Sequence, residues 1–377
     1  MTAPAGGERI RDPVECVITV NEQAITEFYP YLREVRVKLS RSAAATCTLV
    51  FDSIRTETGE WLIQDAGVFL PWRSIRIDAR FGDRTEEVLR GVIRQVRAEN
   101  PPDMSASTVT VEGQDESLTL DREHVRRPRS TAAEPKSDGD IAAEIAQEKG
   151  FDADTEAGLT NRTLSQDGTA VKLLKERAEA NGFEFFVRAG TLHFRPPQLD
   201  GDPQPTIMVY AGLATNCLRF TTTFDGHMPD EVRVLRAAET GTGEDDHTIA
   251  PDLPLLGTDS VTSEGAGAPF VWVLQQPGGA TPEEATARAQ AAANQNAWKL
   301  AAEGELDGVL YGHVLLSHQV VAVDGVGETY GGRYYVDEVE HKFSLDGYRQ
   351  TFKLLRNAIG QEPAPAGGGS PVAGVMA

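Results

Sequence analysis

The 377-residue sequence has few cysteines, no long hydrophobic run and no excess of basic residues. Its three cysteines, Cys16, Cys47 and Cys217, are far apart and odd in number, which argues against a disulfide framework, and no CxxC pair is present to hold a metal. We expect small buried thiols in a reducing compartment. No apolar run approaches the ~20 residues of a transmembrane helix, so we expect no membrane span. Residues 1–13 lack the apolar core of a secretory signal, and we expect them to be disordered.

The charge balance is strongly acidic, with 36 Lys and Arg against 57 Asp and Glu, a net charge of −21. A surface of this sign repels phosphates, so stable nucleic-acid binding is not expected. Such a surface could line a passage along which polyanions slide without binding. Solubility alone is the simpler explanation of the charge.

The sequence also lacks the common catalytic motifs, including G-x-S-x-G, H-E-x-x-H and a Walker-type loop. His313 and His318 are five residues apart, on opposite faces of one expected strand, so a shared metal is not expected. Asp245, Asp246 and His247 could hold a cation, but adjacent residues in a Gly-rich loop rarely form a specific site. We therefore expect no catalytic, metal or cofactor site, although a carboxylate pair for glycoside hydrolysis is invisible in sequence.

What the sequence has is period-two hydrophobicity over residues 14–122, where Val35, Val37 and Leu39 alternate with polar residues. The same alternation runs over 75–81 and 108–111. This pattern is typical of strands with one dry and one wet face. With turns between them, it predicts a first antiparallel β-barrel domain.

A polar linker over 123–137 leads to a small α+β domain over 138–198. Asp138 is expected to cap a helix that ends at Gly150, and a second helix is expected between Thr169 and Gly182. A hairpin with its turn at Ala189 and Gly190 completes this domain.

The two-residue period returns over 206–358 and predicts a second β-barrel domain, followed by a flexible tail at 359–377. A long helix is expected over about 281–303, with Thr281 as its cap and Glu284 completing a capping box. The segment 238–268 is expected to be a long mobile loop. The expected strands are 217–224, 231–237, 270–275, 309–316, 319–324, 333–344 and 348–356.

Two segments of the expected barrels resemble each other, RGVIRQVRAE at 90–99 and GRYYVDEVEH at 332–341. Each has apolar residues three apart, Ile93 and Val96 in one and Val336 and Val339 in the other. Because residues three apart face opposite sides of a regular strand, the spacing indicates a β-bulge or a strand buried on both faces. Two copies of one barrel would explain the similarity, and so would chance.

The segment 331–357, GGRYYVDEVEHKFSLDGYRQTFKLLRN, places a histidine among aromatic and acidic residues around a tight turn at Asp346 and Gly347. A general base needs a positioned acid on its own face, but Glu338 and Glu340 point away from the face of His341. A structural, hydrogen-bonded histidine at a barrel seam is the favoured interpretation.

The order of three segments resembles the phage late control protein D family of tail and baseplate hub proteins, and is similar to the hub portion of type VI spike proteins. They are the Ala-rich helix and strand over 283–312, the segment 320–357, and the small domain with its DIAAEIAQEKGF and VKLLKERAEANGFEFFVRAGTLHFRPP stretches. The family pattern falls on residues expected to be structural: Gly332, Tyr335, Val336, His341, Gly347, Tyr348, Phe352, Arg356 and Asn357.

This resemblance implies a non-enzymatic homotrimer in which two barrels per chain form a six-barrel ring. Such a ring would adapt a hexameric tail tube to a trimeric spike around a central channel, in contact with other baseplate proteins. Assembly would take place in the bacterial cytoplasm, within a phage tail or an injection particle. Two alternatives are a tail-associated peptidoglycan hydrolase and a receptor-binding module.

Overall fold

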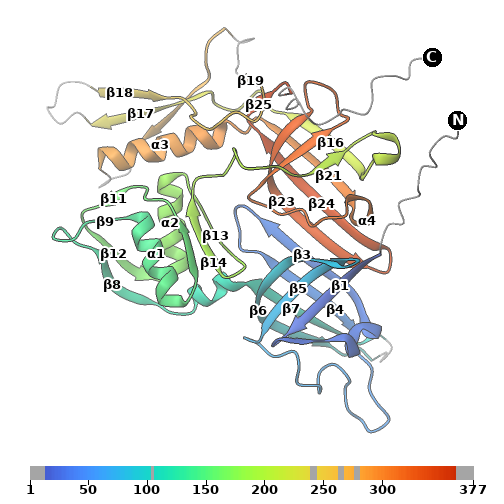
Figure 1. The fold of residues 1–377 in the computed structure, drawn as a ribbon. Coiled ribbons are helices and arrows are strands. Elements are labelled where there is room, and N and C mark those ends of the chain that lie inside the picture. The colour runs from blue at the N-terminus through green and yellow to red at the C-terminus, as the bar shows by residue number, and fades with distance from the viewer. Residues whose placement is uncertain (1–12, 103–105, 238–243, 262–266, 276–280, 362–377) are drawn as a thin grey trace, which may run out of the picture.

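The computed structural model describes residues 13–102, 106–237, 244–261, 267–275 and 281–361. The chain is mainly β, and one large curled sheet dominates it, with a small helical unit at its side (Figure 1). Among the described residues, no helix has the length and apolar character needed to cross a bilayer. The mainly β architecture expected from the period-two pattern is confirmed.

The large sheet has 13 strands in the order β16-β21-β24-β23-β3-β4-β7-β6-β5-β1-β2, with β22 beside β23 and β15 beside β22. It therefore joins strands from both expected barrels in one hydrogen-bonded surface. Its strands are β1 (Val14–Val20), β2 (Gln23–Ala24), β3 (Leu32–Ser40), β4 (Thr46–Asp52), β5 (Ser74–Phe81), β6 (Arg84–Glu99), β7 (Thr108–Asp115), β15 (Gln204–Met208), β16 (Cys217–Phe224), β21 (Leu300–Asp307), β22 (Val320–Asp324), β23 (Gly332–Ser344) and β24 (Gly347–Arg356).

The small unit packs two helices against short strands around its own apolar core, which includes Ile141, Leu174 and Phe194. Its elements are β8 (Val125–Ser130), β9 (Lys136–Ser137), α1 (Asp138–Lys149), β10 (Asp152–Thr155), β11 (Thr160–Asn161), β12 (Leu164–Gly168), α2 (Ala170–Asn181), β13 (Glu184–Arg188) and β14 (Thr191–Arg195). The hairpin β13–β14 turns at Ala189 and Gly190, both with positive φ, as the sequence predicts.

A third layer consists of a three-stranded sheet and the helix α3, which lies between that sheet and α2 (Figure 1). Ala285, Ala289 and Ala293 form a buried ridge of small side chains on α3, which lets the helix approach the sheet closely. The remaining elements are β17 (Glu231–Ala237), β18 (Glu244–Ile249), β19 (Asp259–Ser260), β20 (Val271–Gln275), α3 (Pro282–Asn296), α4 (Gly308–Tyr311), β25 (Ala358–Ile359), and the 3-10 helices η1 (Thr26–Tyr31), η3 (Glu116–Asp121) and η4 (Gly212–Ala214).

The helix ends follow local capping chemistry. Gly150 and Gly182 adopt left-handed conformations at the ends of α1 and α2, and Thr169 and Thr281 cap α2 and α3. The expected cap of α1 is wrong by one residue, because Ser137 accepts from the Asp140 N–H while the Asp140 carboxylate accepts from the Ser137 N–H.

Several expected boundaries differ from the structure. The segment 125–130, placed in a linker, is strand β8, because it pairs with β12. The helix expected to reach 303 ends at Asn296, and residues 300–307 form β21 between two neighbouring strands. The strand expected at 309–316 is wrong, because the Asp307 side chain accepts from the N–H groups of Val309 and Leu310 and starts the short helix α4.

The 238–268 segment is not one continuous loop. Strand β18 lies within it and pairs with β17, and β19 pairs with β25. The latter pair also places Ile359 in a strand, where the sequence predicts the start of a tail. The N-terminal residues 1–12, the loop residues 238–243 and 262–266, and the tail residues 362–377 lie outside the described residues.

The large sheet contains the same five-strand arrangement twice. In the first half the order is β5-β6-β7-β4-β3, and in the second half it is β22-β23-β24-β21-β16. Numbered along the chain, both orders are third, fourth, fifth, second and first, and every neighbouring pair is antiparallel. We call these two units the first and the second module.

Matched β-bulges strengthen this correspondence. The register shifts at Arg94 between β6 and β7, and at Asp337 between β23 and β24, which are equivalent positions in the two similar segments. It shifts again at Arg33 between β3 and β4, and at the equivalent Leu218 between β16 and β21. The bulge that the three-residue apolar spacing predicts is therefore present in both segments.

Replacing Ser137 by Ala is expected to lower the free energy of unfolding by about 1 kcal/mol, because the mutation removes the acceptor for a helix N-terminal N–H group. Urea unfolding followed by circular dichroism measures the change. Ser137→Thr, which keeps a hydroxyl acceptor, is the control and should lose less. Equal losses for both variants would contradict the capping explanation.

Candidate assembly interface

The two modules meet where β3 of the first pairs antiparallel with β23 of the second. The pairing covers Glu34–Ser40 opposite Glu338–Ser344, and we call this contact the intrachain joint. On its core side Val35, Val37 and Leu39 are buried. Its outer side carries three cross-strand ion pairs: Lys38 Nζ to Glu338 Oε1 at 3.2 Å, Arg36 Nε to Glu340 Oε1 at 3.6 Å and Lys342 Nζ to Glu34 Oε2 at 3.0 Å.

His341 lies in the middle of this joint and is fully buried. Its Nδ1 is 2.8 Å from the Tyr348 hydroxyl, and the Tyr348 ring stacks on Phe343 with centroids 4.1 Å apart. Phe343 and Tyr348 belong to β23 and β24 but pack into the core of the first module. Burial lowers the pKa of His341 to about 3, so the imidazole is neutral at pH 7.

The small unit is fastened to both modules by polar contacts. Arg188, at the end of β13, donates to the Ser317 carbonyl at 3.0 Å in the second module, and burial lowers the pKa of its guanidinium to about 10. The N–H of Gly190, in the neighbouring turn, donates to Glu116 Oε2 at 2.8 Å, just after the first module. These contacts fix the small unit against the modules through one hairpin.

Glu184 is the most perturbed carboxylate in this contact. It is buried, accepts a 2.6 Å hydrogen bond from the Tyr335 hydroxyl, and lies 3.9 Å from the Arg41 guanidinium. Burial raises the pKa of Glu184 to about 7, although the Tyr335 hydrogen bond and Arg41 oppose the shift. The Tyr335 ring stacks on Trp298, with centroids 5.8 Å apart. Tyr335 therefore links β23 to the small unit.

Arg356 closes the far end of the second module. Its fully buried guanidinium lies 5.2 Å from the Tyr334 ring centroid and donates to backbone carbonyls. The acceptors are the carbonyls of Leu256 at 3.1 Å, Thr329 at 3.5 Å, Gly331 at 2.8 Å and Gly360. A Cβ on Gly332, which has a φ of +121°, would lie 2.8 Å from Arg356 Nη2, so the cage leaves no room for a larger residue.

Six of the nine residues of the family pattern fall into two groups at opposite ends of β23 and β24. Tyr348 and His341 lie at the intrachain joint, next to the turn residue Gly347. Gly332, Arg356 and Asn357 lie at the cage, where the Asn357 side chain bonds the Leu256 N–H and the Pro254 carbonyl. Tyr335, Val336 and Phe352 lie between the two groups and are buried.

The other sequence candidates lie apart from each other. His313 contacts Glu86 at 2.9 Å, and His318 stacks on Phe186 at a centroid distance of 3.8 Å. His247 is exposed on β18. Within the described ranges, no group of three or more His, Cys, Asp or Glu side chains is arranged to hold a metal ion.

Sequence reasoning missed Arg41, Glu184 and Arg188, which carry the contact between the small unit and the modules. Their partners are distant in sequence, and a charged residue on an alternating strand looks solvent-exposed when its partner strand is unknown. That Glu184 and Val187 are both buried, although they are three residues apart on β13, is seen only in the structure.

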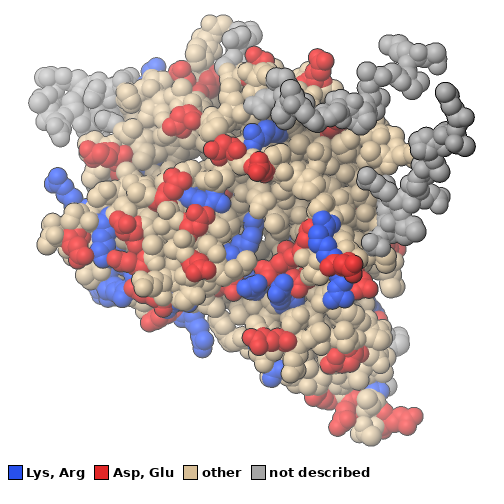
Figure 2. All heavy atoms as spheres, in the orientation of Figure 1, with Lys and Arg blue, Asp and Glu red and all other residues tan. Residues whose placement is uncertain are grey.

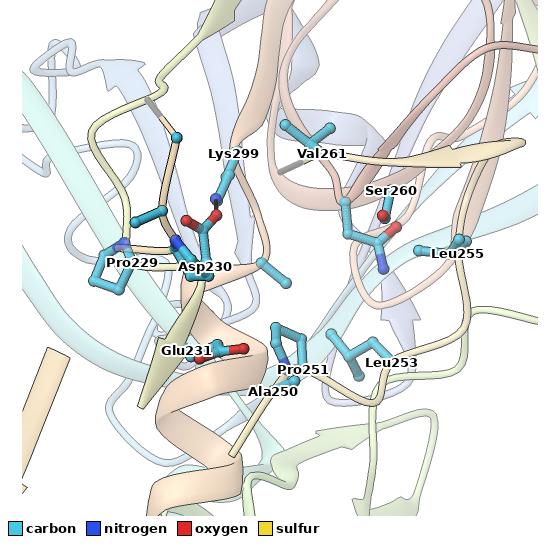
Figure 3. Close-up of a pocket in the computed structure, with 15 residues that line it drawn as sticks. Pro229, Asp230, Glu231, Ala250, Pro251, Leu253, Leu255, Ser260, Val261 and Lys299 are labelled. Carbon is cyan, nitrogen blue, oxygen red and sulfur yellow. Dashed lines mark hydrogen bonds and ion pairs between the residues drawn. The ribbon is translucent and has the colours of Figure 1, made fainter. Parts of the chain in front are cut away.

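A cavity of about 490 Å³ lies beside the cage, between α3, β17 and the 250–261 segment (Figure 3). Its walls include Pro229, Leu253, Leu255 and Val261. The ammonium of Lys299 and the carboxylate of Asp230 are paired with each other at one side of it. A charge pair that is already satisfied internally does not by itself point to a ligand.

Charges of both signs are interspersed over the face shown in Figure 2. Many surface charges among the described residues form ion pairs, such as Arg94 on β6 with Glu112 on β7 at 3.2 Å, and Arg90 with Glu87 within β6 at 2.7 Å. Paired charges of this kind leave no extended basic surface on this face to follow a phosphate backbone.

Several solved structures share this architecture. The chain matches the 43 kDa tail protein of prophage MuSo2 from Shewanella oneidensis at 14% identity and a TM-score of 0.68, over 92% of this chain and 99% of that chain. It matches the tail protein of Neisseria meningitidis MC58 at 13% identity and a TM-score of 0.63, over 92% and 98%. The Escherichia coli c3393 protein matches at 12% identity and a TM-score of 0.52, over 93% and 79%.

The fold is therefore that of phage tail proteins, and the expected resemblance to tail and type VI spike-associated proteins is confirmed. The c3393 protein is described as a component of the type VI secretion system with structural similarity to the T4 bacteriophage tail proteins gp27 and gp5. Residues 11–228, more than half of the chain, match the family described as the Alg8 N-terminal domain, and the chain belongs to that family. No curated protein matches the chain.

Acidification is expected to destabilise the protein partly through His341. The pKa of this group is about 3 when folded and about 6.5 when unfolded, so the unfolded state binds the extra proton between these values and stability falls as pH falls below 6.5. Between pH 7 and pH 5 this amounts to about 2 kcal/mol.

Replacing His341 by Gln keeps a hydrogen-bonding group beside Tyr348 but removes the titration. Urea unfolding of both proteins at pH 7 and pH 5 should show a smaller loss in the variant, with His318 common to both. The same pH-dependent loss in both proteins would rule out His341 as its source.

Replacing Arg356 by Met is expected to lower the free energy of unfolding by about 3 kcal/mol or more, because several buried carbonyls lose their donor. Lys353→Met on the same strand is the control, and a change below about 1 kcal/mol is expected because Lys353 is a surface ion-pair residue. Urea unfolding measures both. Equal effects would show that the cage does not stabilise the second module.

Proposed function

We propose that this chain is the structural hub of the baseplate in a contractile tail or injection particle. The observation that carries the proposal is the repeated module, with the same strand order and two bulges at equivalent positions. In this proposal three copies assemble into a ring, so that six modules face a hexameric tail tube while the three-fold arrangement faces a trimeric spike. Closed homo-oligomers of this kind are the common form of assembly in soluble proteins.

A repeated module solves a symmetry mismatch physically. A chain that carries one module could present only three equivalent surfaces in a trimer, and six tube subunits would then have unequal partners. Two modules related by the intrachain joint supply six similar surfaces from three chains. The fold shared with tail proteins and with a type VI component supports this proposal.

The proposed role needs no catalysis. We propose that the nine family-pattern residues hold the joint and the cage rigid, since most of them are buried and hydrogen-bonded to backbone or to one another. The partners in this proposal are further copies of the chain, the tail tube, the spike and other baseplate proteins. Assembly takes place in the bacterial cytoplasm, as part of the particle.

The purified chain is expected to form a trimer of 40.8 kDa subunits, visible by electron microscopy as a three-fold ring with six lobes. Mass photometry measures the number of copies, and image classification counts the lobes. A chain that stays monomeric inside the assembled particle would refute the hub proposal.

Cell-wall zymography with the same preparation separates the hub from the rival hydrolase. No clearing is expected. Clearing that persists at high purity would favour a peptidoglycan hydrolase instead.

A further inference from the structure

Two stretches of the large sheet have no neighbouring strand on one side, although the equivalent stretches of the other module do have one. Strand β16 is the end of the sheet and, in the part of the chain that the structure describes, pairs with β21 alone. Strand β6 pairs with β5 only as far as Val92, so its last residues 95–99 have β7 on one side and no strand on the other among the described residues. Each edge leaves backbone N–H and C=O groups without a strand partner.

The module correspondence shows what these edges match. Strand β16 is the equivalent of β3, aligned by the bulges at Leu218 and Arg33. The segment 95–99 is the equivalent of 338–342 in β23, aligned by the bulges at Arg94 and Asp337. In the intrachain joint these two equivalents, β3 and β23, pair with each other. The chain therefore contains this joint once, between β3 and β23. It also carries the two strands for a second joint, β16 and residues 95–99 of β6, which do not pair with each other within the chain.

Side-chain exposure agrees with a missing neighbour on both edges. Phe224 on β16 is 48% exposed, whereas its equivalent Leu39, covered by the joint, is 4% exposed. Ala98 on β6 is exposed, whereas its equivalent His341 is fully buried. An exposed phenylalanine on the core side of an edge strand is a feature of a surface that becomes covered.

We propose that β16 of one chain pairs antiparallel with residues 95–99 of β6 in a second copy, in the register of the intrachain joint. The number of copies rests on the proposed function, and the choice of edges and register rests on the repeated module. The facing residues are Gln95 with Asp225, Val96 with Phe224, Arg97 with Thr223, Ala98 with Thr222, and Glu99 with Thr221.

Charge complementarity supports this register. In the intrachain joint Lys342 bonds Glu34 diagonally across the two strands, with 3.0 Å between Nζ and Oε2. The equivalent residues in the proposed joint are Glu99 and Arg219, so the pair is repeated with its signs exchanged. Each chain would use β16 to contact one neighbouring copy and residues 95–99 to contact another. Such head-to-tail contacts form a closed ring when the rotation between copies allows it.

Disulfide cross-linking tests the register. The variant Arg97→Cys with Thr223→Cys is expected to form covalent dimers and trimers on a non-reducing gel after mild oxidation, because facing residues have Cα atoms close enough for a disulfide. The matched positive control is Glu340→Cys with Lys38→Cys, the equivalent pair of the intrachain joint, which should cross-link within one chain.

Three further variants control for other reactions. Each single substitution, Arg97→Cys or Thr223→Cys, reports any disulfide with the native cysteines or between identical positions. Arg97→Cys with Thr222→Cys places the thiols on opposite faces and should cross-link poorly. Trimers by mass photometry without the Arg97–Thr223 cross-link would overturn the proposed edges while leaving the hub intact, and absence of any oligomer would overturn both.

The proposed contact buries Phe224, so a substitution at this residue gives a second test of the association between copies. Phe224→Asp is expected to weaken association at least tenfold, while its far-ultraviolet circular dichroism spectrum stays the same as that of the unmutated chain, because the side chain is 48% exposed in the single chain. Ile54→Asp, at a position 52% exposed in the loop after β4, is the matched control and should associate normally.

Charge reversal adds a rescue test of the proposed pair between Glu99 and Arg219. Glu99→Lys should weaken association, and Glu99→Lys with Arg219→Glu should restore it. Equal weakening by both would refute the proposed register.

Discussion

The pairing of β3 with β23 is the interaction on which the rest of the structure depends. It converts two five-strand modules into one sheet and supplies hydrogen bonds to edges that would otherwise be open. Its core side carries apolar residues that neither module could cover alone, and Phe343 and Tyr348 cross from one module into the core of the other. The relative position of the modules is therefore set by backbone pairing and by packing together.

The small unit and α3 are arranged around this joint. Glu184 and Arg188 lie at the start and the end of strand β13, and each contacts the second module through a buried polar group. Buried polar contacts of this kind are costly unless their partners are well placed, so they favour one orientation of the unit over others. The hydrogen bonds to Tyr335 and Ser317 explain why the charged residues Glu184 and Arg188 occur on β13 beside Phe185, Phe186 and Val187.

One continuous hydrogen-bonded sheet runs through both modules of the chain. A force applied to one module would reach the other through the backbone hydrogen bonds of this continuous sheet as well as through side-chain contacts. The net charge is −21, and charges of both signs are interspersed on the face seen in Figure 2. An acidic excess favours solubility and weak interaction with polyanions. Tail proteins from Shewanella and Neisseria share this fold.

The sequence by itself determined what local chemistry controls. Period-two hydrophobicity located most strands of both modules, the Gly150 and Gly182 stops located two helix ends, and the apolar spacing at Ile93 and Val336 predicted the paired bulges. These features depend on residues within a few positions of each other, so a linear pattern records them.

Only the tertiary structure decided which distant strands pair and what surrounds each polar residue. The segment after Asn296 became a strand instead of more helix because β16 and β24 lie on either side of it. His341 is neutral and buried because β3, more than 300 residues earlier in the chain, covers its face. Arg356 is caged by carbonyls from three separate segments. Those partners are brought together by the fold, and no pattern along the chain encodes the distance between them.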